Sequence, residues 1–258
     1  MRELILRLKE KPDISLEVEG VLPNVVAEMR LEDIENLPIQ YGNKKVKLSE
    51  FFDVSFEKSE VPRIVFEGDM SRVKRIGWKL DGGEIIVEGN AGMYLGAFMS
   101  GGRIVVEGDV GDFSALNMKG GEIIVRGNAG NYLCASYRGE WRGMGGGTVL
   151  VEGNVGKEMG ANMRNGKIVV KGTADEFAGV SMKGGLIVLE KAKARVGAGM
   201  TGGVIVANEV EDLLPGFLEE GTVENPEIEG EVFEGTFKVY TGDHAERRAK
   251  GRIYVRIQ

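Results

Sequence analysis

The stretch Glu84-Ile85-Ile86-Val87-Glu88-Gly89 returns as Arg103-Ile104-Val105-Val106-Glu107-Gly108 and again as Glu122-Ile123-Ile124-Val125-Arg126-Gly127, each copy beginning nineteen positions after the one before. Related runs begin at Thr148, Lys167, Leu186 and Val204. A repeat period of about 20 residues is typical of a solenoid, in which each repeat forms one turn and stacks on its neighbour.

Each repeat has the composition of a short strand followed by glycine corners. Val and Ile favour the pleated backbone, and glycine adopts angles that other residues resist. A helical crossover between parallel strands needs about 30 residues, so a βαβ unit does not fit the period. The sequence therefore predicts an all-β fold, a right-handed parallel β-helix with turns of about 19 residues. Its strands are expected at Ile64, Ile85, Ile104, Ile123, Val149, Ile168, Ile187 and Ile205.

Stacked turns align equivalent positions in columns, and alternation along each strand decides which columns face inward. We expect Ile85, Val87 and their equivalents to form the core. Two outward columns alternate in charge, Glu84, Arg103 and Glu122 in one, and Glu107, Arg126, Glu152, Lys171 and Glu190 in the other. An outward apolar stripe lies between them, made of Ile86, Val105, Ile124, Leu150, Val169 and Val188. Such a stripe is unusual on a soluble monomer, so we expect a cover, either the chain's own terminal segments or a partner subunit.

The second half of each turn contributes a methionine column, namely Met99, Met118, Met163, Met182 and Met200, and Tyr137 is expected where a methionine is missing. Because unbranched methionine packs into irregular gaps, we interpret this column as core filling and not as a metal or redox site. An aromatic column follows nearby, interrupted by Glu158, and consists of Tyr94, Phe113, Tyr132 and Phe177.

One repeat is longer than the others. The interval from Ile123 to Val149 is twenty-six positions, and the seven additional residues lie within 137–147. An insertion into one turn emerges as a loop on one face of a solenoid, often the binding face. Arg138, Trp141 and Arg142 give this loop the composition of an interface, because Trp and Arg are enriched among the residues that dominate binding. The alternative is a purely structural loop.

Residues 1–62 precede the repeat and are predicted to form a small α+β cap segment. Alternating residues indicate strands over 4–8 and 14–18, joined as a hairpin around Lys11-Pro12-Asp13, and a helix is expected over 25–37. The segment 48–56 is expected to cover the first turn, because the end of a solenoid exposes unpaired backbone.

Residues 63–208 are predicted to be the parallel β-helix repeats, and residues 209–258 a C-terminal β segment. The sequence predicts an irregular exit over 209–216, and a pair of strands over 237–240 and 252–257. His244 is the single histidine; a metal site or a proton shuttle with Asp243 and Glu246 is the alternative, and we interpret His244 as a surface residue.

Composition excludes several classes of function. The net charge is −7 with a pI near 5.1, and no basic patch is evident, which argues against a nucleic-acid partner. Cys134 is alone, so no disulfide, zinc or iron–sulfur ligand set is expected. No signal peptide or apolar run of membrane-spanning length is present, so we expect a cytoplasmic protein without membrane contact. We assign no catalytic, cofactor-binding or metal-binding residue: polysaccharide-cleaving β-helices line a groove with charges, whereas the recurrent charges here alternate in sign.

The repeat, as in Gly89-Asn90-Ala91-Gly92, Met99 and the run from Gly102 to Gly108, resembles the C-terminal β-helix of the large glutamate synthase subunit, known for its GXGXG repeat. The whole chain resembles the C subunit of formylmethanofuran dehydrogenase more closely. The features that carry this resemblance are the segment from Leu37-Pro38-Ile39-Gln40-Tyr41-Gly42-Asn43 to Phe52, the seven-residue insertion, and the closing segment from Gly242-Asp243-His244-Ala245-Glu246-Arg247 to Val255.

The resemblance implies a non-catalytic scaffold in an archaeal oxidoreductase complex that reduces CO2 to formylmethanofuran, the first step of methanogenesis from CO2. It implies a tungsten or molybdenum pterin and iron–sulfur clusters on a formate-dehydrogenase-like redox subunit. An amidohydrolase subunit and a small pterin-binding subunit are the other expected partners. The alternatives are the C subunit of a formyltransferase/hydrolase complex and a stand-alone glutamate-synthase-like β-helix interaction domain.

Overall fold

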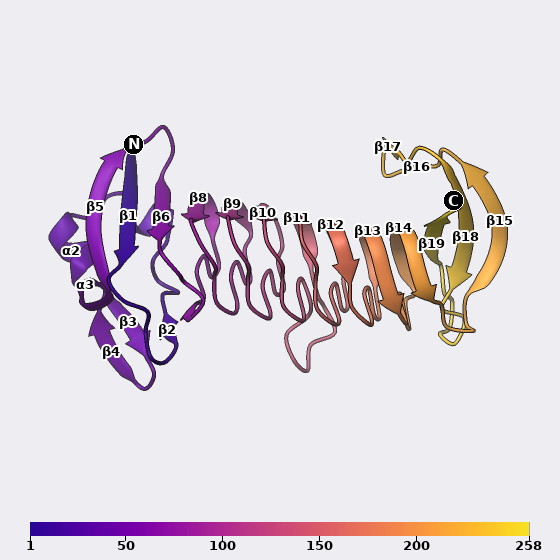
Figure 1. The fold of residues 1–258 in the computed structure, drawn as a ribbon, viewed down its shortest axis with the longest axis horizontal. Helices are drawn as coiled ribbons and strands as arrows, with labels where there is room; N and C mark the ends of the chain where they lie inside the picture. Colours follow the sequence, from indigo (N-terminus) through magenta and orange to yellow (C-terminus); the bar gives the residue numbers. More distant parts are fainter. Residues whose placement is uncertain (258) are drawn as a thin grey trace.

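The computed structural model describes residues 1–257, and the molecule is an elongated row of strands with the two ends of the chain at opposite ends of the row (Figure 1). Seven strands of the row pair in parallel with their neighbours in sequence order, β8 (Asp81–Val87), β9 (Gly101–Val106), β10 (Glu122–Val125), β11 (Gly145–Val151), β12 (Asn165–Ala174), β13 (Lys183–Ala194) and β14 (Gly202–Asp212). β6 (Arg63–Glu67) precedes β8 in the same parallel arrangement. We call residues 63–208 the repeat region.

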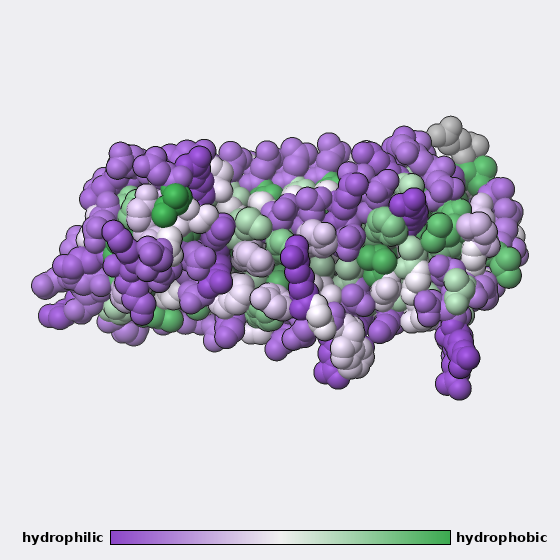
Figure 2. Space-filling model, turned by 90° about the horizontal axis from the view of Figure 1, so that it is seen from below, coloured by the Kyte–Doolittle hydropathy of each residue, from purple (hydrophilic) through white to green (hydrophobic). Residues whose placement is uncertain are grey.

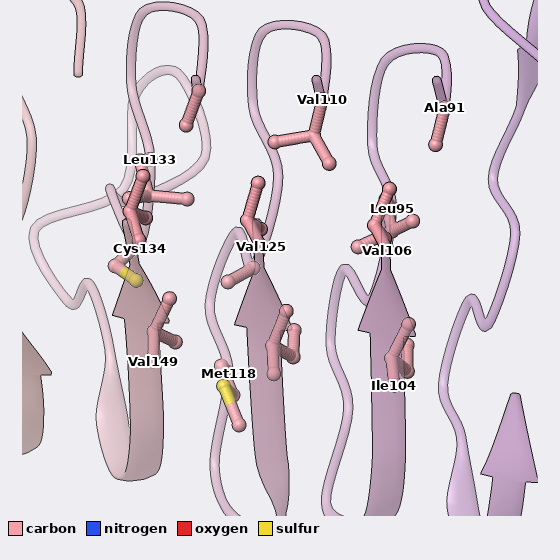
Figure 3. Packing of buried hydrophobic residues seen from close by; sticks show 14 of the residues in the cluster. Ala91, Leu95, Ile104, Val106, Val110, Met118, Val125, Leu133, Cys134 and Val149 are labelled. Carbon is pink, nitrogen blue, oxygen red and sulfur yellow. The ribbon is translucent and has the colours of Figure 1, made fainter. Parts of the chain in front are cut away.

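The register of this sheet places equivalent residues of successive turns opposite one another. Ile85 pairs with Ile104, Ile104 with Ile123, and Ile123 with Val149. These side chains are fully buried, and Figure 3 shows buried side chains of this cluster filling the interior between the strands and the opposite side of each turn. Bridges such as Ala91 to Val110 extend the pairing of turns outside the strands. The predicted inward columns and strand positions are therefore confirmed.

The sheet extends beyond the repeat at both ends. At the N-terminal end, β1 (Arg2–Leu8) pairs in parallel with β6 and covers the first turn, and β5 (Phe52–Lys58) pairs antiparallel with the other edge of β1. The segment 48–56, expected to cover the first turn, therefore lies one strand further out, although Phe52 packs against Phe66 of β6. At the C-terminal end, β19 (Gly251–Arg256) pairs in parallel with β14, followed by antiparallel β18 (Thr236–Gly242) and β15 (Leu218–Glu224). Antiparallel strands therefore cover both ends of the parallel stack.

The predicted N-terminal hairpin is wrong. β1 belongs to the long sheet, whereas β2 (Leu16–Glu17) lies in a second sheet of four strands with β3 (Pro38–Tyr41), β4 (Lys44–Lys47) and β7 (Val73–Lys74). The physical reason is the free edge of β6, whose backbone groups are satisfied by β1.

The predicted helix over 25–37 is replaced by two short helices, α1 (Pro23–Val26) and α2 (Leu31–Glu35), and α3 (Leu48–Phe51) precedes β5. Arg30 has extended backbone between α1 and α2, and the bend lets Val26 and Ile34 enter the same core. None of the helices in residues 1–257 has the length and apolarity needed to cross a membrane.

The predicted irregular exit at Glu209 is also wrong, because β14 continues to Asp212 by pairing with the extended β13. The predicted strand pair is confirmed by β18 and β19. Between β15 and β18 the chain forms a small hairpin of β16 (Glu227–Ile228) and β17 (Glu231–Val232), which carries the buried Ile228.

The gap in the methionine column is filled by Met144 and not, as expected, by Tyr137. Met144 is 0% exposed, whereas Tyr137 is 49% exposed. The Met144 carbonyl accepts a hydrogen bond from the Arg164 amide at 2.8 Å, as the Met163 carbonyl does from Lys183 one turn later. The seven additional residues therefore precede the core position and leave the stacking intact.

Replacing Met144 with Ala should lower the free energy of unfolding by about 2 to 5 kcal/mol, because the substitution leaves a cavity in a fully buried column. The matched control, Tyr137→Ala, should cost much less, since half of that side chain is exposed. Guanidinium denaturation followed by circular dichroism compares the two. Equal losses would contradict the assignment of Met144 to the core.

Candidate interaction surface

The insertion loop, residues 137–147, extends from the side of the stack between β10 and β11 (Figure 1). Its base is held by Asn117 of the preceding turn. The Asn117 amide oxygen accepts a hydrogen bond from the Tyr137 backbone at 2.6 Å, and its nitrogen donates one to the Arg142 carbonyl at 2.9 Å. The Gly143 amide donates to the Asn162 carbonyl at 2.8 Å. Both ends of the loop are therefore fixed while its tip faces solvent.

Trp141 lies at the exposed tip of this loop and is 56% exposed. Three cations lie over its ring, with the Arg142 and Arg164 guanidinium carbons 4.6 and 4.4 Å from the ring centre and the Lys183 amine at 5.2 Å. A cation over the face of an indole is attracted by the ring's negative electrostatic potential. The predicted residues Trp141 and Arg142 therefore join two basic residues from later turns.

The predicted residue Arg138 lies on a different part of the surface. Its guanidinium carbon is 5.8 Å from the centre of the Phe113 ring, which stacks on Tyr94 and Tyr132 at 5.2 and 4.7 Å between ring centres. These aromatic side chains are half-buried on the outside of the stack. A pocket at this site is lined by Met93, Tyr94, Phe113, Tyr137 and Arg138. The insertion loop thus contacts the aromatic column at one end and basic side chains at the other.

Sequence reasoning missed Arg164 and Lys183, although both follow a methionine of the core column and are one repeat, nineteen positions, apart. Figure 2 shows the face seen from below, where pale and apolar groups lie scattered among hydrophilic ones along the length of the molecule. The nineteen-residue spacing of Arg164 and Lys183 is visible in the sequence. The two residues form a cluster with Trp141 only because the stacking of turns brings them beside the insertion loop.

The predicted charge ladders are present over part of their length. Arg103 bonds Glu84 at 2.9 Å and Glu122 at 2.8 Å, and in the other column Glu152 pairs with Arg126 at 2.7 Å and Lys171 at 3.4 Å. The Arg126 hydrogen bond is the main cause that lowers the pKa of the Glu152 carboxyl from its ordinary value. Glu190 instead accepts a hydrogen bond from Asn208 at 2.6 Å. Exposed pairs of this kind stabilise the fold little.

The apolar stripe between the ladders is covered by the chain itself at its C-terminal end. Val188 packs in a cluster with Ile228 and Phe237 from the C-terminal segment. In the middle, Val105 and Ile124 are only 7% and 9% exposed, whereas Leu150 and Val169 are partly exposed. The first of the two expected covers is confirmed for the C-terminal end of the stripe.

The residues around His244 do not converge. The Asp243 carboxylate is buried and accepts hydrogen bonds from the Gly199 and Ala245 amides at 3.1 and 3.0 Å, whereas His244 and Glu246 are exposed. His244 is therefore a surface residue, as predicted, whereas the Asp243 carboxylate satisfies backbone donors inside the fold.

Metal binding and thiol chemistry require clustered ligand side chains or an accessible cysteine. Across residues 1–257 there is no group of three or more His, Cys, Asp or Glu side chains that could hold a metal ion. Cys134 is buried in the interior (Figure 3), and burial raises the pKa of its thiol, which disfavours the thiolate needed for metal binding or nucleophilic chemistry.

Comparisons with known proteins give consistent relationships. The family model described as the GXGXG motif matches residues 70–251. The C subunit of the tungsten-containing formylmethanofuran dehydrogenase 2 of Methanococcus maripaludis is 50% identical over 100% of this chain and 98% of the relative. The protein of the same description from Methanothermobacter thermautotrophicus is 52% identical over 100% of this chain and 97% of the relative.

A molybdenum-containing relative and a solved structure extend this picture. The C subunit of the molybdenum-containing formylmethanofuran dehydrogenase 1 of Methanothermobacter marburgensis is 52% identical over 54% of this chain and 35% of the relative. A chain from the crystal structure of the formyltransferase/hydrolase complex of Methylorubrum extorquens with methylofuran matches with a TM-score of 0.89. It is 28% identical, and the match covers 98% of this chain and 100% of that chain.

Replacing Asn117 with Ala should release the base of the insertion loop, because two backbone groups lose their partner. We expect trypsin to cleave after Arg138 and Arg142 several-fold faster than in the unaltered protein. Asn154→Ala is the matched control, since Asn154 bonds the Thr173 backbone at 2.8 Å and does not touch the loop. Mass spectrometry of timed digests provides the measurement, and unchanged cleavage would show that Asn117 does not hold the loop.

Cys134 should resist iodoacetamide at pH 8 in the folded protein, because burial raises its thiol pKa and shields the sulfur. In denaturant the same thiol should be labelled readily. Mass spectrometry before and after unfolding provides the comparison, and rapid labelling of the folded chain would contradict the packing of this turn.

Proposed function

This chain belongs to the family of formylmethanofuran dehydrogenase C subunits, and on that premise we propose that it is a non-catalytic structural subunit of a formylmethanofuran dehydrogenase complex. The supporting observation is the extent of the similarity, 50 to 52% identity over all of this chain, which includes the segments on both sides of the repeat. In the proposed assembly CO2 is reduced to formylmethanofuran, and this chain supplies a rigid surface on which catalytic subunits are positioned.

We infer that the repeat region is a right-handed parallel β-helix. The support is the sequence-ordered parallel pairing from β6 to β14, with one turn of chain between successive strands and additional bridges outside the strands. Boundaries at residues 62 and 208 are proposed for the repeat, with the segments on either side acting as caps. A rod of this kind suits a scaffold, because each turn is held by the turns on both sides of it.

The tungsten or molybdenum centre is proposed to lie on a partner subunit. The relatives are described as tungsten-containing and molybdenum-containing. The donors of this chain do not fit such a centre, since its single cysteine is buried as a thiol and its single histidine is exposed without converging ligands. The proposed partners are a formate-dehydrogenase-like redox subunit, an amidohydrolase subunit and a small pterin-binding subunit, in the cytoplasm.

The second candidate is the corresponding subunit of a formyltransferase/hydrolase complex. The structural likeness, with a TM-score of 0.89, favours it as an architecture. The sequence favours the dehydrogenase, because identity is 28% to that chain and 50 to 52% to the dehydrogenase subunits. A stand-alone interaction domain is the remaining alternative.

A tagged copy of this chain, expressed at its native level in the source organism, should co-purify with larger subunits that carry tungsten or molybdenum. The eluate should reduce CO2 to formylmethanofuran, whereas the isolated chain should be inactive. Mass spectrometry and metal analysis provide the measurements. Recovery of the chain alone would contradict the scaffold function, and recovery of transferase subunits without a metal-containing subunit would favour the second candidate.

If the insertion loop is an interface, Trp141→Ala should reduce the recovery of at least one partner by about tenfold or more, the size expected when a dominant interface aromatic is removed. Leu218→Ala is the matched control, since Leu218 is exposed to a similar degree on β15. Quantitative mass spectrometry of the tagged complexes tests this. Equal recovery for both variants would support the purely structural loop.

A further inference from the structure

A column of basic side chains runs beside Trp141 along one edge of the stack. It is formed by the residues that follow the methionines of the core, and each backbone amide donates to a methionine carbonyl of the previous turn: Lys119 to Met99, Gly145 to Met118, Arg164 to Met144, Lys183 to Met163, and Thr201 to Met182, at 2.7 to 2.8 Å. With turns about 4.8 Å apart, the three steps from Lys119 to Lys183, which include its basic members, span about 14 Å.

This basic column differs from the two charge ladders on the strands. In the ladders, opposite charges alternate, as in Glu84, Arg103 and Glu122, and neighbours form ion pairs. In the basic column, Arg164 and Lys183 occupy adjacent turns with the same charge. Neighbouring like charges repel one another, so the arrangement is unfavourable unless an anion lies close to both.

Anionic partners for these side chains are absent from residues 1–257. Lys119, Arg142, Arg164 and Lys183 form no ion pair within the described chain, although 14 other Lys and Arg residues of the chain do. The Nε atom of Arg164 is buried and is the one buried side-chain nitrogen or oxygen in this part of the chain without a hydrogen-bond partner. The Trp141 ring lies over this guanidinium, so a docked anion meets Arg164 through its other nitrogens and not through the buried Nε.

The insertion loop completes this surface. Gly145, in the turn that carries the insertion, has no side chain, and Trp141 lies against the next two members of the column, Arg164 and Lys183. An added Cβ at Gly145 would meet nothing closer than the Met118 carbonyl at 4.0 Å, so backbone crowding does not explain the glycine. The result is an exposed aromatic ring surrounded by cations, on a chain whose net charge is −7.

We propose that the surface formed by Lys119, Trp141, Arg142, Arg164 and Lys183 docks a carboxylate-rich surface of another protein subunit. This inference rests on the proposed function and specifies the chemistry of one partner. Planar guanidinium groups bind carboxylates through two parallel hydrogen bonds, and the exposed indole provides apolar contact at the centre. Tryptophan and arginine together dominate the binding energy of many interfaces.

A protein partner fits this surface better than a nucleic acid. The column is a single line of cations, whereas nucleic-acid sites use a broad basic surface to follow the phosphates. The remainder of the chain is acidic and would repel a long polyanion. The expectation from sequence that no basic patch exists is therefore corrected here: the patch is local and is assembled by stacking.

The test uses the complex purified through a tagged copy of this chain. A zero-length carbodiimide cross-linker joins an amine to a carboxylate only where the two are in direct contact. We expect cross-links from Lys119 or Lys183 to Asp or Glu residues of a partner subunit. In the double variant Arg164→Glu with Lys183→Glu, recovery of that same subunit should fall at least tenfold, and in the unaltered complex its release should increase with salt.

Two further variants test whether the position of the charge, and not a general change in charge, controls docking. Gly145→Glu places a carboxylate within the column, in open space, and should weaken docking even though no basic residue is removed. Lys44→Glu with Lys45→Glu is the matched control, because both lysines are exposed on β4, away from the column, and its complex should be unchanged. Circular dichroism confirms that each variant is folded.

The outcomes separate this inference from the proposed function. If the unaltered chain is recovered without any other subunit, the proposed function fails and the docking proposal fails with it. If the complex assembles normally but the charge-reversed variants retain every subunit and no lysine of the column is cross-linked, only the docking proposal is overturned. Nuclease-sensitive material bound to the unaltered chain and lost in the variants would also overturn it, in favour of a nucleic-acid partner.

Discussion

The in-register stacking of buried Ile and Val from one turn to the next is the interaction on which the rest of the structure depends. Successive side chains of a strand alternate between faces, so a shift of one residue would move Ile104 from the core to the surface. Close backbone approach at the corners reinforces the register. A Cβ on Gly102 would lie 2.8 Å from the Gly83 carbonyl oxygen, so turns at this separation need glycine there, and its φ of +77° is one that glycine adopts readily.

The same register explains why a seven-residue insertion is tolerated. β11 pairs with β10 at Val149 and Ile123, as though the intervening chain had the ordinary length. Met144 returns the chain to the methionine column before β11 begins its pairing with β10, and Asn117 holds both sides of the loop. An insertion placed within the strand would have disrupted core pairing, whereas this one adds surface without disturbing the stack. A binding element can therefore be carried on a rigid support.

The sequence was sufficient for features repeated in every turn and insufficient for features that occur once. Strand positions, inward columns and part of the charge ladders were predictable, because the same sequence pattern recurs in each turn. The pairing of β1 with β6 and of β19 with β14 was not, since alternation identifies a strand but not its neighbour. At the surface, the composition of the loop indicated Trp141 and Arg142, while Arg164 and Lys183 needed the stacking of turns to place them beside the ring.

The repeat region carries two kinds of charged column, the ladders of alternating charge and the basic column. They differ in how strongly they attract a partner protein. Columns of alternating sign satisfy their own charges and have little attraction for a neighbour, and they flank the apolar stripe whose C-terminal end the chain covers itself. A column of one sign cannot satisfy itself, and it attracts a surface of opposite charge while repelling a similar one. Because turns separate these columns by fixed steps, a partner must match both the sign and the spacing of the charges. We therefore expect the basic column, in which charges do not alternate in sign, to determine which partner protein the repeat region binds.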